Sequence, residues 1–169
     1  MSLQAFWESV EASGLGSYVA SSSWAFPVLE TIHVMAIVTV VGSIAVMDLR
    51  LLGLASTDRP VSEVSRDTLP MTWGAFVIAV LSGSLLFVSK ASEYAVNPNF
   101  QWKMVLIALA GVNMAVFHLF TWKSVGDWDN DRSAPLPGRI AGALSLGIWI
   151  TVVFFARAIG FTLDLYSTF

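Results

Sequence analysis

The 169-residue sequence contains no cysteine and few charged residues. Without thiols the chain cannot form disulfides, thiolate zinc sites, iron–sulfur clusters or the covalent links of c-type haem. Charged residues make up 12% of the chain, whereas a soluble domain carries about 25%. This leaves too little charge to cover a water-facing surface, and 56% of the residues are hydrophobic. The composition therefore predicts an integral membrane protein, in contact with the lipid bilayer over most of its surface.

The few charged residues also exclude one class of partner. The formal net charge is −3, and the sequence lacks the clustered Lys and Arg that nucleic-acid binding requires. We therefore expect no nucleic-acid partner. Because thiolates are absent, any metal or cofactor must be held by His, Met, carboxylates or the backbone.

Four apolar segments are long enough to cross a bilayer, which takes about 20 residues. They cover residues 24–49, 70–92, 101–123 and 139–163, and short polar connections join them. Trp24, Trp73, Trp102 and Trp122 lie near the span ends, as interfacial anchors do. The pattern predicts an all-α fold, with a single transmembrane four-helix bundle over residues 1–169.

A short amphipathic segment precedes the first span. Within residues 2–13, Leu3, Phe6, Trp7 and Val10 follow helical spacing. We expect a helix that Ser2 caps and that Gly14 or Gly16 ends, lying either in the membrane interface or packed over the end of the bundle.

The basic residues indicate an orientation. One membrane face collects most of them, namely Arg50, Arg59, Arg66, Lys123, Arg132 and Arg139. The opposite face has Lys90, Lys103 and Arg157. Since basic residues favour the cytoplasmic side, we expect the first and third loops inside the cell and both termini outside it. The expected location is a bacterial inner membrane.

Ionisable residues inside spans are costly to bury, and each suggests a function. The first span carries Glu30 and His33 one turn apart, on the helix face that ends at Asp48. The third span carries the other histidine, His118. At 1.5 Å per residue, His33 lies about 13 Å below the outer boundary and His118 about 24 Å below it.

These residues fit b-type haem. A neutral imidazole is a common axial ligand, and a methionine such as Met114 can supply the second. Gly111 lies at about the depth of His33 and would leave room for a flat porphyrin if spans one and three face each other. Arg157, Lys103 or Lys90 could pair with propionates, and Glu30 could accept the second ring N–H of His33 or pair with Arg157.

Two other interpretations stay open. Glu30-x-x-His33 has the spacing of carboxylate-bridged di-iron bundles, but such sites need a second pair. Alternatively, His33 could hydrogen-bond a neighbouring helix and Glu30 could pair with Arg157, which would fix the packing without any chemistry. Span two has small residues at Ala75, Ala79 and Gly83, a pattern for close helix contact either within the bundle or in a homo-oligomer.

The chain resembles known families over two stretches. They read "WAFPVLETIHVMAIVTVVGSIAVMDLRLLG" (24–53) and "NFQWKMVLIALAGVNMAVFH" (99–118). Together they resemble an uncharacterised family of small four-helix bacterial membrane proteins, along nearly the whole chain. The stretch "IHVMAIVTVVGSIAVMDLRLLG" is more loosely similar to copper-resistance D-type proteins and the membrane protoporphyrinogen oxidase. That second resemblance implies a haem-ligand role for His33 alone.

We therefore expect a cytochrome b-like, iron-containing haem protein, with His33 as the first ligand candidate and His118 as the second. It would carry out electron transfer or redox chemistry with a redox partner or a membrane-soluble substrate such as a quinone. The alternatives are a metal-ion or small-solute transport protein using Glu30, His33 and His118, and a purely structural oligomerising subunit.

Overall fold

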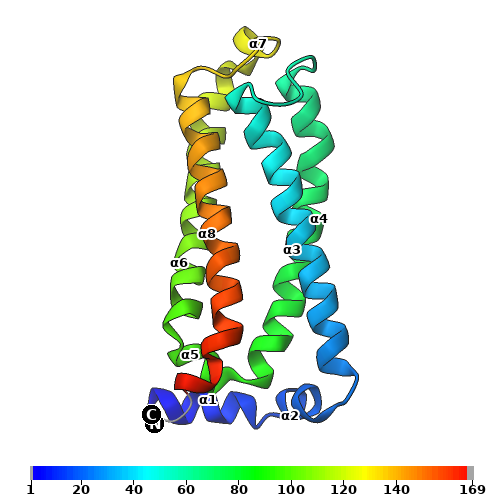
Figure 1. Ribbon diagram of the computed structural model, residues 1–169, viewed down its shortest axis with the longest axis vertical. Helices are drawn as coiled ribbons and strands as arrows, with labels where there is room; N and C mark the ends of the chain where they lie inside the picture. Colours follow the sequence, from blue (N-terminus) through cyan, green and yellow to red (C-terminus); the bar gives the residue numbers. More distant parts are fainter. Residues whose placement is uncertain (1, 167–169) are drawn as a thin grey trace.

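Four long helices form the body of the molecule (Figure 1). The computed structural model describes residues 2–166, and the long helices are α3 (Ala25–Leu52), α4 (Val61–Ser89), α6 (Pro98–Val116) and α8 (Leu136–Tyr166). Each is long and apolar enough to cross a membrane, α6 together with the turns that continue it to Trp128. The expected all-α membrane bundle is confirmed, and the described residues contain no strand.

Short helices close the two ends of the bundle. At the terminal end, α1 (Leu3–Glu11) and α2 (Gly14–Ser21) lie across the long helices, and α5 (Ala91–Val96) lies beside them (Figure 1). At the opposite end, the loop end, α7 (Val125–Trp128) follows α6. Ser2 caps α1 as expected, since its Oγ accepts from the Ala5 amide. Gly14 does not end that helix but begins the next one, because Ser13 supplies a second cap to the amide of Gly16.

Helix α4 begins at Val61 rather than at residue 70. Its first turn is capped from another loop: the Asp129 carboxylate accepts from the Ser62 amide and hydroxyl, both at 2.7 Å. Burial acts to raise the pKa of Asp129, but the Ser62 hydrogen bonds and the Arg50 charge hold it below its usual value. Pro70 therefore lies inside the helix, on an exposed face, although proline usually breaks a helix interior.

The third span is not one straight α-helix. After Val116 the chain forms a π-helical turn, Phe117–Thr121, and then a 3-10 turn, Trp122–Ser124. Single π-helical turns are rare and occur often at functional sites. This one contains His118.

The long helices pack unequally. Helix α3 packs along α4 and α8, and α6 packs along α8, but α4 and α6 make no extended contact in the described part of the chain. The central core consists of Val40, Ala75, Ala110, Trp149 and Val152. The small residues of α4 face α3, since Ala75 and Ala79 are buried and Gly83 lies against an α3 side chain. Their packing partner is therefore within the bundle.

A buried arginine ties the loops together at the loop end. Arg50 is fully buried at the end of α3 and donates hydrogen bonds to four backbone carbonyls. They belong to Arg59, Asp129, Asp131 and Arg132, at 2.8–3.4 Å. The first loop and the third loop are thus held by one side chain. Close by, Gly53 ends α3 with φ +73, and a Cβ there would lie 2.8 Å from the Arg132 carbonyl oxygen.

Candidate functional site

His33 lies at the contact between α3 and α4, where its ring makes a hydrogen bond. Its Nδ1 is 3.0 Å from Oγ of Ser82. The Ser82 hydroxyl donates to the Ile78 carbonyl at 2.7 Å, so its oxygen is left to accept the Nδ1–H of His33. The Nε2 atom then carries the lone pair. A neutral imidazole in this state is ready to bind a metal, because the hydrogen bond at the other nitrogen fixes the ring.

The space for the His33 ring comes from a glycine on α4. A Cβ at Gly83 would lie 2.8 Å from Cε1 of His33, so no larger residue fits while the ring keeps this position. Gly111, the glycine expected beside His33, lies in a different part of the bundle, where a Cβ would meet no atom within 4 Å. Spans one and three do not bring these two residues together.

Glu30 is not the acceptor for His33, because Ser82 fills that role. Glu30 is exposed, and no ion pair joins it to Arg157 in the described structure. Burial raises the pKa of Tyr94 in α5, and the charges of Glu30 and Glu93 raise it further. The charge of Glu30 is thus felt at Tyr94 of α5, at the terminal end of the bundle.

The basic residues expected to face propionates have other neighbours. The Arg157 guanidinium lies 4.8 Å from the centre of the Phe161 ring. The ammonium of Lys103 lies 4.8 Å from the centre of the Phe100 ring. The Nζ atom of Lys90 lies 3.3 Å from Oε2 of Glu93.

His118 lies in another part of the bundle and, like His33, makes its hydrogen bond through Nδ1. Its Nδ1 is 2.9 Å from the Met114 carbonyl, which can only accept, so Nδ1 carries the hydrogen and Nε2 is free. The residue is half-buried. It lines a pocket in the loop-end half of the bundle, together with Gly111 and Met114.

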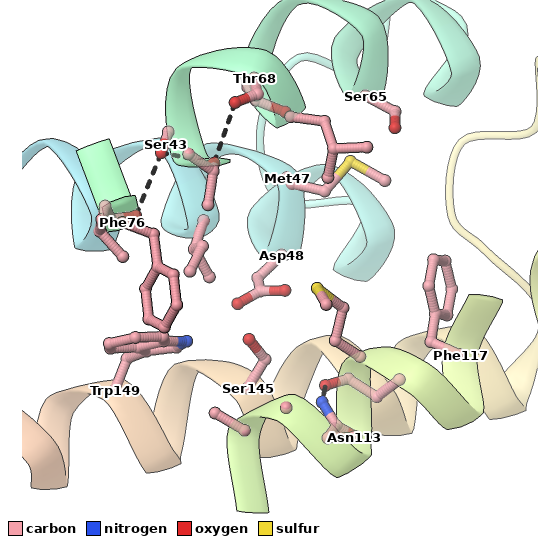
Figure 2. A pocket seen from close by; sticks show the side chains of 18 of the residues that line it. Ser43, Met47, Asp48, Ser65, Thr68, Phe76, Asn113, Phe117, Ser145 and Trp149 are labelled. Atoms are coloured by element: carbon pink, nitrogen blue, oxygen red, sulfur yellow. Dashed lines mark hydrogen bonds between the residues drawn. The ribbon is translucent and has the colours of Figure 1, made fainter. Parts of the chain in front are cut away.

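That pocket has a volume of about 270 Å³ and reaches between all four long helices. A carboxylate lies at its centre: Asp48 of α3 is directed toward α6 and α8, and Ser145 of α8 faces it (Figure 2). Asp48 is only 5% exposed, and its Oδ2 is buried without a hydrogen-bond partner. Trp73, Phe76 and Trp149 contribute aromatic walls.

The predicted site residues therefore fall into two groups. Gly111, Met114 and His118 line the pocket, whereas Glu30, His33, Lys103 and Arg157 do not. Counted from the helix starts, His33 is about 12 Å into α3 and His118 about 30 Å beyond the start of α6. A single haem with both histidines as ligands does not fit this arrangement. The chemistry of each histidine alone does fit a haem iron.

Three residues of these sites were missed by sequence reasoning. Ser82 is an ordinary helix residue in the sequence, and only the neighbouring small-residue pattern at Ala79 and Gly83 pointed to this contact. Ser145 gave no signal. Asp48 could have been found, because it is an ionisable residue inside an apolar run.

No cluster of three or more His, Asp or Glu side chains suited to a metal ion occurs among the described residues. The donor set of a carboxylate-bridged di-iron site is thus not assembled there. No protein-family model, curated protein or solved structure matches the chain.

Proposed function

We propose that this multi-pass membrane protein binds b-type haem through His33 and serves electron transfer. The observation that carries the proposal is the hydrogen bond between Ser82 and the ring of His33. Its Nδ1–H is held by Ser82, its Nε2 lone pair is free, and Gly83 makes space for the ring. An imidazole inside a span is expensive to bury. Metal-bound histidines usually donate their other ring N–H to an acceptor, and the Ser82 hydroxyl would be that acceptor here.

A bound haem would supply one-electron redox chemistry. The chain would hold the iron at Nε2 of His33 and fix the ring orientation through Ser82. His118 is the second candidate ligand, at a separate position, because it has a free Nε2 as well. A quinone or a redox protein would exchange electrons with the haem, and a second copy of the chain could complete the ligand set in a homo-oligomer.

The rival functions receive less support. A transport path through Glu30, His33 and His118 would need these groups along one route, but Glu30 is at the terminal-end surface and only His118 lines the pocket. A purely structural role would explain the His33–Ser82 hydrogen bond but would not require a free Nε2 on both histidines.

The proposal predicts a haem spectrum. Protein purified from haem-replete cells should show a Soret band and reduced-state bands of b-type haem. His33→Ala should abolish the band of the haem that it ligates, and His118→Ala should at most shift or partly reduce the spectrum. Met35→Ala is the matched control, since Met35 is an exposed residue of the same helix. Wild-type protein without Soret absorbance would contradict the proposal.

We further propose that the protein lies in a bacterial inner membrane with its loop end in the cytoplasm. Arg50, Arg59, Arg66, Arg132 and Arg139 lie at or near this end, which fits the positive-inside rule. A C-terminal alkaline phosphatase fusion should therefore be active, and a C-terminal green fluorescent protein fusion should be dark. The reverse result would invert the orientation.

A further inference from the structure

The pocket contains a buried acid, Asp48, which Ser145 faces and which has no ion-pair partner among the described residues. Asp48 is 5% exposed, and its Oδ2 has no hydrogen-bond partner. No Lys or Arg is among the described residues that line the pocket. An isolated carboxylate in a low-dielectric interior is costly unless a cation or a donor meets it. The described lining therefore supplies no permanent cation to Asp48, and its one basic side chain is the imidazole of His118.

The walls around this carboxylate suit an organic body rather than a bare ion. Trp73, Phe76, Phe117 and Trp149 line the pocket, and Met47 and Met114 add polarisable surface. Aromatic faces attract cations, more strongly where water is excluded. The volume of about 270 Å³ lies just below the range of about 300–1,000 Å³ for drug-sized ligands. It suits a small head group with one ring.

The pocket is reached from the side of the bundle. Its lining residues on α4 and α6 flank the line where these two helices make no extended contact. Trp73 on α4 and Met114 on α6 line the pocket and are also 48% and 36% exposed. Gly111 of α6 also lines the pocket, and a Cβ there would meet no atom within 4 Å. Because this surface belongs to the membrane-spanning segments, the opening faces lipid.

We propose that this pocket binds a lipophilic organic monocation, which enters from the bilayer between α4 and α6 and pairs with Asp48. The cationic head would lie beside the carboxylate and against the aromatic walls, and the apolar part would extend toward the lipid. The site lies apart from the first candidate haem ligand, because His33 does not line this pocket, but His118, the second candidate, does.

The test uses benzyltrimethylammonium, a permanent cation with one ring, and the purified full-length protein in zwitterionic nanodiscs. Isothermal titration calorimetry should show saturable binding to the wild type. Asp48→Asn should weaken binding by about tenfold or more, the equivalent of about 1.4 kcal/mol. Asp127→Asn is the control, since Asp127 is an exposed acid at the loop end outside the pocket. The uncharged isostere neopentylbenzene should bind about tenfold more weakly than the cation.

A second variant tests the opening without touching the acid. Gly111→Leu should fill the entrance and abolish binding, while Gly147→Leu, at an open position of α8 outside the pocket, should bind as the wild type does. Equal binding of the cation and its neutral isostere would overturn the proposal. So would wild-type affinity in both Asp48→Asn and Gly111→Leu, or an absence of saturable binding in the wild type.

Discussion

Replacing Arg50 by alanine is expected to destabilise the protein by about 3–5 kcal/mol. The side chain is fully buried and donates to four backbone carbonyls from two loops. Removing it takes a donor away from these carbonyls, of which only that of Asp129 keeps a backbone donor, the Val61 amide, among the hydrogen bonds of the described residues. It also opens a cavity at the end of α3, and each buried polar group left unsatisfied costs about 1–3 kcal/mol. Thermal unfolding in detergent should show a midpoint lower by roughly 6–20 °C.

The control for this variant is Arg139→Ala. Arg139 lies near the start of α8 at the same end of the molecule, but its side chain is exposed. Its loss should change the free energy of unfolding by less than about 0.5 kcal/mol. Arg50→Lys should fall between the two, because an ammonium keeps the charge but cannot reach four carbonyls as a guanidinium does. If Arg50→Ala changed the free energy of unfolding no more than Arg139→Ala, the hydrogen bonds of Arg50 to the two loops would contribute nothing to stability.

Replacing Ser82 by alanine is expected to lower haem affinity by about 10–100-fold, the usual loss when the hydrogen-bond partner of a metal-bound histidine is removed. The hydroxyl accepts the Nδ1–H of His33, so without it the ring loses its fixed tautomer and orientation. The affinity can be measured by titrating haem into protein prepared without it and following the Soret band.

Ser84→Ala is the matched control for Ser82→Ala. Ser84 is on the same helix, is exposed, and donates to the Val80 carbonyl, as Ser82 donates to Ile78. The two variants therefore lose the same helix hydrogen bond and differ in the contact with His33. Equal haem affinities in the two variants would show that Ser82 does not support the ligand.

The fold could be predicted from the sequence because four long apolar runs leave few other solutions. The boundary at Pro70 could not, because the cap that lets α4 begin at Val61 comes from Asp129, far away in the chain. The π-helical turn at His118 was also invisible to a periodicity of 3.6 residues.

The site was harder to predict, for a reason of geometry. Helical periodicity gives the face on which His33 lies but does not say which neighbour that face meets. Depth alone predicts that Gly111 of span three lies beside His33, but the glycine in contact with its ring is Gly83 of α4. The depth gives the position of a residue along the bundle axis, whereas the order of the helices around the bundle decides which neighbours it meets. The sequence places Asp48 on span one, but it does not show that Ser145 and Trp149 of the last helix line the same pocket.

The position of the Arg50 acceptors has a consequence for biosynthesis. Arg50 ends the first long helix, but three of its four acceptors, at Asp129, Asp131 and Arg132, follow the third. While the ribosome is still making the second and third helices, the guanidinium has only the Arg59 carbonyl within the nascent chain. It must therefore stay hydrated at the membrane surface until the last connection emerges. The bundle can therefore close at this end only after three helices are complete. The hairpin of α3 and α4 and the hairpin of α6 and α8 thus join late in biosynthesis.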